Sequence, residues 1–414
     1  VTVPGHWQAN AAFAHADGPL FYRHRFEAGG VAPAAGRRSW LQFDGIFYQG
    51  DVWLDGSYLG DTEGYFFPHT FEVTDPVAAR RQHVLAVEVA CTPPDDRTAK
   101  RNLTGIFQHW DCIDPAWNPG GIWAPVRLLE TGPVRISSLR VACRDARSEQ
   151  ASLDLDVDLD AAAAATATIT TMLRRHPDGP EIVRHQADEA LAAGRNRARW
   201  RVTVDNPALW WPHALGDQPL YRVDVDVAIP APSGQADGPG DLVSSDHRQV
   251  VTGLRQVRMR DFVATVNGER IFLKGANYGP TRRGLADVTA EALEADVALA
   301  RQAGLDLLRV HAHVGHPGLY DVTDRQGLLV WKDLPLQWGY ARVRRQAVRQ
   351  ARHAVATLGH HPSVAIWCAH NEPLALDVSP GSTVSRSDAG RFVAAQMLPT
   401  WNKTALDRSI KRAL

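Results

Sequence analysis

The chain has 414 residues, 44% of them hydrophobic, which is enough for two to four domains with apolar cores. Lysine and arginine (45) nearly balance aspartate and glutamate (46), so the formal charge of −1 gives no net field that would attract nucleic acid or anionic lipid. No stretch is long and apolar enough to span a membrane, and the four cysteines contain no CxxC pair, which argues against a zinc site or a disulfide framework.

Residues 1–132 have the pattern of an all-β domain. Short runs rich in β-branched and aromatic residues alternate with turns such as Asp55-Gly56, at a spacing typical of a β-sandwich. The predicted strands are Leu20–Phe26, Ser39–Phe43, Gly50–Leu54, His83–Val89 and Ala124–Leu129.

Residues 133–258 indicate a second, smaller sandwich. Within Ala151–Leu159 aspartate alternates with apolar residues, which predicts a strand with one solvated face. Thr166–Thr171 favours another strand. Residues 230–246 are rich in proline, glycine, serine and aspartate, so we expect a long exposed hairpin loop there.

The pattern changes at about residue 259, where strand-like and helical stretches begin to alternate, as they do in βαβ units. The expected strands are Ile271–Gly275, Leu305–His311, Leu328–Leu334 and Val364–Cys368, and the expected helices are Thr289–Ala303, Pro317–Gln326, Arg342–Leu358 and Asp388–Leu414. Four such units make half of a (β/α)₈ barrel, a fold of roughly 250 residues. We therefore expect residues 259–414 to form an incomplete TIM barrel in which the chain stops in mid-domain.

One stretch of this region presents polar residues where a barrel carries its chemistry. Val364–Trp367 is a short run of mostly bulky apolar residues, as expected for a buried barrel strand, and Asn371 and Glu372 follow at its carboxyl end. An isolated Asn-Glu-Pro would more simply cap the next helix. The surrounding pattern favours a catalytic position instead.

Several motifs carry a family resemblance by their order and spacing. They are Val-Trp-Leu-Asp-Gly at 52–56, Gly-Ile-Trp-Ala-Pro-Val at 121–126, Asn-Pro-Ala-Leu-Trp-Trp-Pro at 206–212, Gly-Asp-Gln-Pro-Leu-Tyr at 216–221, Gly-Leu-Arg at 253–255 and Asn-Gly-Glu-Arg-Ile-Phe-Leu-Lys-Gly-Ala-Asn at 267–277. Together they resemble glycoside hydrolase family 2, the family of β-mannosidases, β-galactosidases and β-glucuronidases. The resemblance implies a jelly-roll-like sugar-binding sandwich (1–132), an immunoglobulin-like sandwich (133–258) and the first half of a TIM-barrel catalytic domain (259–414).

The same resemblance implies a retaining exo-β-glycosidase with two carboxylates. Glu372 matches the general acid/base, which protonates the departing glycosidic oxygen and later deprotonates water. Asn371 matches the neighbour that hydrogen-bonds the sugar 2-hydroxyl. The nucleophile would lie on the seventh strand, beyond Leu414, so we expect the 414-residue chain alone to be inactive. No cofactor and no metal are implied.

Other residues match the family's substrate-binding positions. Arg309 and His311 correspond to the strand-two arginine and a nearby histidine, and Arg309 would orient the nucleophile; the alternative is an ion pair within the barrel core. Asp333, after a run that resembles the β-mannosidase branch, is a candidate for sugar hydroxyls or a cap for the next segment. Trp338 and Trp367 are candidate sugar platforms, although tryptophan more often packs in a core.

Two other classes of function remain open from the sequence. One is a carbohydrate-binding protein without catalysis. The other is a metal-dependent hydrolase, because His311 and His313 on a strand would place both imidazoles on one face. We expect a cytoplasmic protein without a nucleic-acid or membrane partner; secretion stays open because the sequence begins Val-Thr-Val-Pro. The sequence also leaves open a homo-oligomer of the full-length protein.

Overall fold

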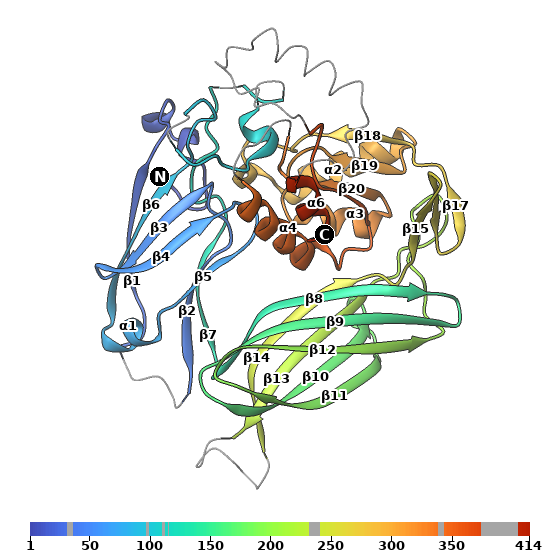
Figure 1. Cartoon of the computed structure of the whole chain (residues 1–414), viewed down its shortest axis with the longest axis horizontal. Coiled ribbons are helices and arrows are strands. Elements are labelled where there is room, and N and C mark those ends of the chain that lie inside the picture. Colours follow the sequence, from blue (N-terminus) through green and yellow to red (C-terminus); the bar gives the residue numbers. More distant parts are fainter. Residues whose placement is uncertain are drawn as a thin grey trace.

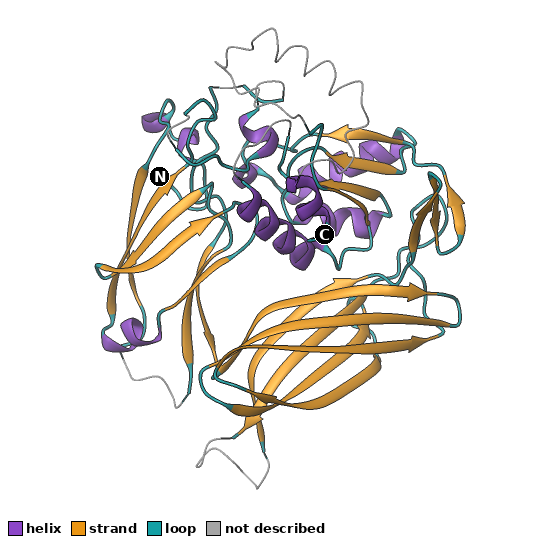
Figure 2. Cartoon of the chain, in the orientation of Figure 1, coloured by secondary structure: helices purple, strands orange, loops and turns teal. Residues whose placement is uncertain are grey.

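The structure is a computed structural model that describes residues 1–30, 36–96, 99–109, 112–114, 116–231, 241–337, 343–373 and 405–414. Two regions built mainly of strands flank a third region in which helices surround a parallel sheet (Figures 1 and 2). Among the described residues, no helix has the length and apolar character needed to cross a bilayer.

The first region is a sandwich of two antiparallel sheets, with strand orders β1-β6-β3-β4 and β5-β2-β7. Its strands are β1 (Leu20–Glu27), β2 (Arg38–Phe43), β3 (Gln49–Leu54), β4 (Ser57–Glu63), β5 (His69–Glu72), β6 (Gln82–Ala90) and β7 (Val126–Thr131), with helix α1 (Thr74–Ala79) and 3₁₀ turns at Trp7–Ala9, Ala11–Phe13 and Gly105–Gln108. Buried and partly exposed residues alternate along β3 and β6, because successive side chains of a strand point to opposite faces of the sheet. Asp55 and Gly56 both have positive φ (53° and 83°), which confirms the predicted turn between β3 and β4.

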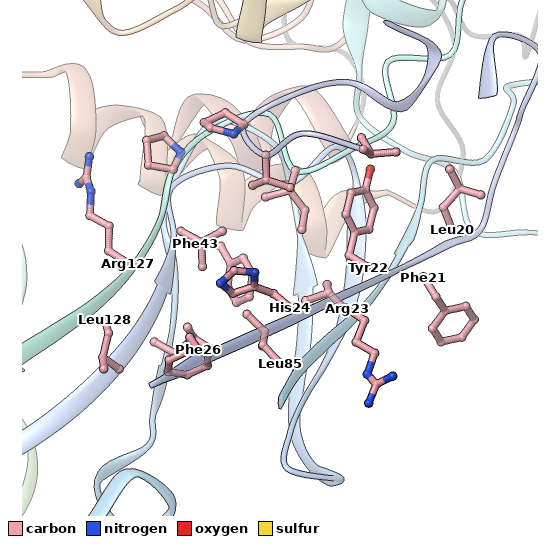
Figure 3. A pocket seen from close by; sticks show the side chains of 18 of the residues that line it. Leu20, Phe21, Tyr22, Arg23, His24, Phe26, Phe43, Leu85, Arg127 and Leu128 are labelled. Atoms are coloured by element: carbon pink, nitrogen blue, oxygen red, sulfur yellow. The ribbon is translucent and has the colours of Figure 1, made fainter. Parts of the chain in front are cut away.

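The two sheets of this sandwich leave a gap between β1 and β7, the outer strands of their sheets. An apolar cavity of about 770 Å³ opens there, and Figure 3 shows side chains from both sheets lining it, among them Phe26, Phe43, Leu85 and Leu128. This cavity belongs to the first sandwich and is lined by none of the predicted catalytic or sugar-binding residues.

The second region is a sandwich of sheets β11-β10-β13-β14 and β12-β9-β8. Its strands are β8 (Val134–Ala146), β9 (Gln150–Ala161), β10 (Ala165–Arg175), β11 (Glu181–Leu191), β12 (Gly194–Asp205), β13 (Tyr221–Pro230) and β14 (Leu242–Thr252). The prediction of one solvated face is confirmed: alternate residues of β9 are buried, and Asp154 on the other face pairs with Arg201 of β12 at 2.7 Å. The predicted loop at 230–246 is too long, because β14 already begins at Leu242; residues 232–240 lie outside the described residues.

A small antiparallel sheet connects this sandwich to the helical region. It contains β15 (Val257–Arg260), β16 (Val263–Val266) and β17 (Glu269–Ile271). The prediction of one strand over Ile271–Gly275 is therefore wrong. Ile271 pairs back onto Ala264, Phe272 is 80% exposed, and the first parallel strand begins only at Gly275. A single apolar run is divided here between two sheets.

The third region is a four-stranded parallel sheet of order β18-β19-β20-β21. Its elements are β18 (Gly275–Tyr278), a 3₁₀ turn at Leu285–Asp287, α2 (Ala290–Gln302), β19 (Leu307–Val310), α3 (Gly318–Gln326), β20 (Leu329–Asp333), α4 (Arg344–Leu358), β21 (Val364–Cys368) and α6 (Ala405–Lys411). The predicted alternation of strands and helices is confirmed, and Thr289 caps α2 by accepting a hydrogen bond from the Ala292 amide. Of the last predicted helix, residues 388–404 lie outside the described residues, and the described part is helical only to Lys411.

Both sandwiches hold the parallel sheet in place. The first sandwich shares one apolar core with it, and the loop at Gly105 approaches so closely that the Ile106 amide donates to the Ala312 carbonyl at 3.2 Å. At the second sandwich, the Arg255 guanidinium donates to the carbonyls of Pro362 and Val364, at 2.9 and 2.8 Å. The parallel sheet is therefore held by contacts with both sandwiches.

Candidate active site at the carboxyl edge of the parallel sheet

Three strands of the parallel sheet end close to candidate residues. Arg309 is the penultimate residue of β19, Asp333 is the last residue of β20, and Asn371 follows β21 by three residues. Since parallel strands end at one edge of their sheet, these side chains belong to the same edge. In the structure Arg309 contacts both Asp333 and Asn371.

Arg309 connects the other two residues. Its Nη2 donates to Asp333 Oδ2 at 2.8 Å and to Asn371 Oδ1 at 2.6 Å, and its Nε donates to Asp333 Oδ2 at 3.1 Å. The guanidinium carbon also lies 5.3 Å from the centre of the Trp331 ring. Burial disfavours the guanidinium charge, but Asp333 outweighs burial and raises the pKa of Arg309. Arg309 therefore stays a fixed cation within this network.

The carboxylate of Asp333 faces inward. The residue is wholly buried, and besides Arg309 it accepts a hydrogen bond from the Ala312 amide at 3.0 Å. In this structure Asp333 therefore orients Arg309 and the loop after β19. The sequence left two roles open for Asp333, a contact with sugar hydroxyls and a cap for the next segment, and the contact with sugar hydroxyls stays a prediction.

Asn371 and Glu372 differ in their exposure. Asn371 is 2% exposed; its amide donates to the Leu336 carbonyl at 3.0 Å, and its side-chain Nδ2 has no hydrogen-bond partner among the described residues. Glu372 adopts a left-handed backbone with φ of 43° and is exposed. The chain thus turns sharply after Asn371 and directs the neighbouring carboxylate away from the core.

His311 and His313 do not form the strand pair that the metal hypothesis requires. β19 ends at Val310, and Ala312 has a positive φ of 46°, so the alternation of a strand does not continue through these residues. His311 Nδ1 lies 3.9 Å from Asp333 Oδ2, whereas His313 is wholly buried, with its ring edge-on to Phe107 at 5.6 Å. The geometric argument for a metal-dependent hydrolase is therefore wrong.

The two tryptophans named as sugar platforms have different outcomes. Trp338 lies outside the described residues. Trp367 is in register with Lys332, one position before the Asp333–Cys368 pair, and packs against the core shared with the first sandwich. Successive residues of a strand face opposite sides, so Trp367 points away from the face that carries Asp333, which favours the alternative that the sequence left open, packing in a core.

Two residues beside the candidate site were missed by sequence reasoning. Lys332 is wholly buried, its ammonium donates to the carbonyls of His313 and Asp333, and burial lowers its pKa to about 7. His370 Nδ1 lies 2.9 Å from Asp407 Oδ1 of α6, across a long separation in sequence. The position of Lys332 within an apolar strand was a signal that could have identified it. No local pattern in the sequence indicated the contact of His370 with Asp407.

Comparison with known families identifies the chain. Residues 134–233 match the family described as glycosyl hydrolases family 2, and residues 9–123 match the glycosyl hydrolase 2 galactose-binding domain-like family. These two matches cover just over half of the chain. The chain belongs to glycoside hydrolase family 2.

Curated relatives of this family 2 chain include β-mannosidase B of Emericella nidulans, 24% identical over 394 residues that cover 89% of this chain and 45% of the relative. An exo-β-D-glucosaminidase of Arthroderma benhamiae is 26% identical over 338 residues, covering 75% of this chain and 34% of the relative. The chain thus spans less than half the length of these two relatives.

Solved structures share the fold of this family 2 chain. The β-D-mannosidase from Dictyoglomus thermophilum aligns with a TM-score of 0.69 and 22% identity, over 84% of this chain and 45% of that one. A β-glucuronidase from Bacteroides uniformis aligns with a TM-score of 0.73 and 20% identity, over 100% of this chain and 47% of that one. At such identities the likeness concerns the fold.

Proposed function

We propose that the protein is a retaining exo-β-glycosidase that removes terminal β-linked sugars, with β-mannosides as the first substrates to test. Family membership supports a glycoside hydrolase, and the curated relatives are named β-mannosidase and exo-β-D-glucosaminidase. The substrate class is a carbohydrate, and the chemistry requires no cofactor.

The architecture proposed for this activity has three domains. We infer a jelly-roll-like sandwich at 1–132, an immunoglobulin-like sandwich at 133–258, and the first half of a (β/α)₈ barrel at 259–414. The parallel order β18-β19-β20-β21 with its intervening helices supports the barrel, since sequential neighbouring strands are how such a barrel is built.

Glu372 is the proposed general acid/base. Cleavage of a glycosidic bond needs a carboxylic acid beside the leaving oxygen, and the same group then activates water against the glycosyl–enzyme intermediate. An exposed carboxylate at the carboxyl edge of the sheet suits this role. The second carboxylate, the nucleophile, belongs by the family resemblance to a later strand.

Asn371 is the proposed partner of the sugar 2-hydroxyl. Its Oδ1 is held by Arg309, which leaves the two hydrogens of Nδ2 to donate toward a hydroxyl oxygen. The contact between Arg309 and Asn371 is the single observation that carries the proposal, because it fixes the amide in one orientation next to Glu372.

The experiment compares Glu372→Gln with the unchanged enzyme, both prepared as the complete gene product that contains these 414 residues. Turnover of a dinitrophenyl β-mannoside, whose leaving group needs no proton, should be spared in its first step. Turnover of an alkyl β-mannoside should fall roughly 10²–10⁴-fold, the usual contribution of a general acid. Glu130→Gln, a change on the surface of the first sandwich, is the matched control. An equal loss on both substrates would remove Glu372 from this role.

A further inference from the structure

A second cavity lies where the two sandwiches meet helix α4. Its volume is about 670 Å³, within the range of small-molecule sites. It is lined by Gln42 and Thr70 of the first sandwich, by residues of β8 and β14 of the second, and by the outer face of α4. None of the residues of the candidate active site lines it.

The lining of this cavity is strongly basic. It contains five arginines and one carboxylate, that of Asp158; the arginines are Arg135, Arg248, Arg345, Arg349 and Arg352. The two histidines that line it add no charge at neutral pH, because burial lowers the pKa of His353 to about 4 and that of His360 well below its usual value. The cavity therefore carries a clear excess of positive charge.

Part of this charge is neutralised. Arg349 forms an ion pair with Glu63, and Arg248 lies 3.9 Å from Asp246. Arg345 and Arg352, both exposed on α4, have no carboxylate within ion-pair distance among the described residues. The helix begins with two arginines and has no acid in its first turn, so these cations lie unfavourably at the positive end of the helix dipole.

Arg135 is the buried arginine among the five that line the cavity. It is 8% exposed, and its guanidinium lies over the Trp40 ring, 4.3 Å from the ring centre, which fixes its plane. Arg38 lies against the same ring but is paired with Glu72 and Asp160. Arg135 forms no ion pair within 4 Å among the described residues, although Asp246 and Asp160 lie near enough to favour its charge, and its buried Nε has no hydrogen bond within the described part of the chain. A buried guanidinium that is fixed in its plane, borders a cavity and keeps one N–H without an acceptor indicates a missing acceptor.

We propose that this cavity binds a small molecule carrying a phosphate or sulfate group. Arginine presents N–H donors in a fixed fork that matches the oxygens of such anions, and Arg135 and Arg352 border the same volume from two different elements. The group would neutralise Arg135 and bridge the second sandwich to α4. The source is either a free inorganic anion or a sugar ester, since both present the same oxygens. This inference does not depend on the proposed glycosidase activity.

The test is isothermal titration calorimetry of the 414-residue chain with inorganic phosphate. We expect saturable binding that weakens as sodium chloride is raised. The double variant Arg345→Gln/Arg352→Gln and the single variant Arg135→Lys should each bind roughly tenfold more weakly or worse, because each loses charge-assisted hydrogen bonds. The matched control is Arg144→Gln/Arg199→Gln, which removes the same charge from exposed positions of the second sandwich and should change affinity less than twofold.

A second titration, with a hexose 6-phosphate, distinguishes the two sources of the anionic group. Tighter binding than phosphate indicates a sugar ester, and equal binding indicates a free anion; both support the site. Absence of saturable phosphate binding at tens of millimolar would overturn the proposal, as would equal weakening in the control variant, which would indicate general charge attraction. The thermal midpoints of the variants show whether each is folded. The exposed Arg345 and Arg352 keep the test valid if Arg135→Lys is unstable.

Discussion

Arg309 of β19 and Asn371 after β21 are joined by a hydrogen bond of 2.6 Å, although 62 residues separate them in the sequence. The same guanidinium is paired with Asp333 at the end of the intervening strand. The ends of three neighbouring strands are thus connected by one cation. A candidate site that depends on such a connection should respond to the loss of any member.

Asp333→Asn should destabilise the chain strongly. The substitution keeps the shape but removes the charge that compensates the half-buried Arg309, and breaking a buried ion pair by removing one partner costs about 3–5 kcal/mol. The measurement is the free energy of unfolding in urea. Asp178→Asn is the control, since Asp178 is 88% exposed and its pair with Arg222 should contribute at most about 1 kcal/mol. Equal effects of the two changes would contradict the account.

Alternating patterns, apolar runs and helical stretches made much of the fold predictable. The alternating aspartates of β9 indicated a strand with a solvated face, and Thr289 marked the start of α2. The strand before Asn371 was predicted with its observed bounds, Val364–Cys368. In β9 the local pattern records which face is buried, and the structure buries that face.

The failures have a shared physical cause. Ile271 and Gly275 belong to different sheets, and the chain leaves the strand before His311, because tertiary contacts rather than local pattern decide where a strand ends. Likewise, the sequence placed Arg309, Asp333 and Asn371 at strand ends and left open an ion pair for Arg309, but it did not identify Asp333 and Asn371 as the partners of Arg309. Contacts between strands depend on register, which no single strand specifies.

Gly105 provides a test of how the first sandwich supports the candidate site. Gly105→Ala would place a Cβ 1.7 Å from the Ala312 carbonyl oxygen, at a φ of 57°. We expect a loss of stability well above the ~1 kcal/mol cost of the backbone conformation alone, because the two loops must separate. Gly56→Ala is the matched control, with a φ of 83° and no atom within 4 Å. Similar urea midpoints for the two variants would show that the loops do not fix each other.

The stability of the chain should fall in acid through His313. Burial lowers the pKa of His313 to about 3 in the folded chain, against about 6.5 when unfolded. Between these pH values the imidazole binds a proton in the unfolded chain but not in the folded chain. The free energy of unfolding therefore decreases as pH falls from about 6.5 toward 3. His313→Gln should reduce this slope by up to about 1.4 kcal/mol per pH unit. His15→Gln, at an exposed position, is the control; an unchanged slope in His313→Gln would contradict the prediction.

Titration of Lys332 should change the stability of the chain at alkaline pH. Burial lowers the pKa of its ammonium to about 7, below the unfolded value of about 10.4, so the unfolded chain binds more protons between these limits. Stability contributed by this group therefore rises as pH increases from about 7 to 10. Unfolding in urea at pH 7.5 and 9.5 measures the rise, which Lys332→Met should remove and the exposed Lys411→Met should preserve. A rise that persists in Lys332→Met would assign it to other groups.

The most direct measurement of the central claim is the product that Glu372→Gln forms from an activated β-mannoside in the presence of azide, with the complete gene product as the enzyme. Azide needs no general base, so it should attack the glycosyl–enzyme intermediate on the face where Glu372 normally activates water. We expect faster turnover with azide and a β-configured mannosyl azide, identified by nuclear magnetic resonance, which the unchanged enzyme does not accumulate. An α-configured azide, or no azide product and no rate increase, would contradict the assignment of Glu372 as acid/base of a retaining glycosidase.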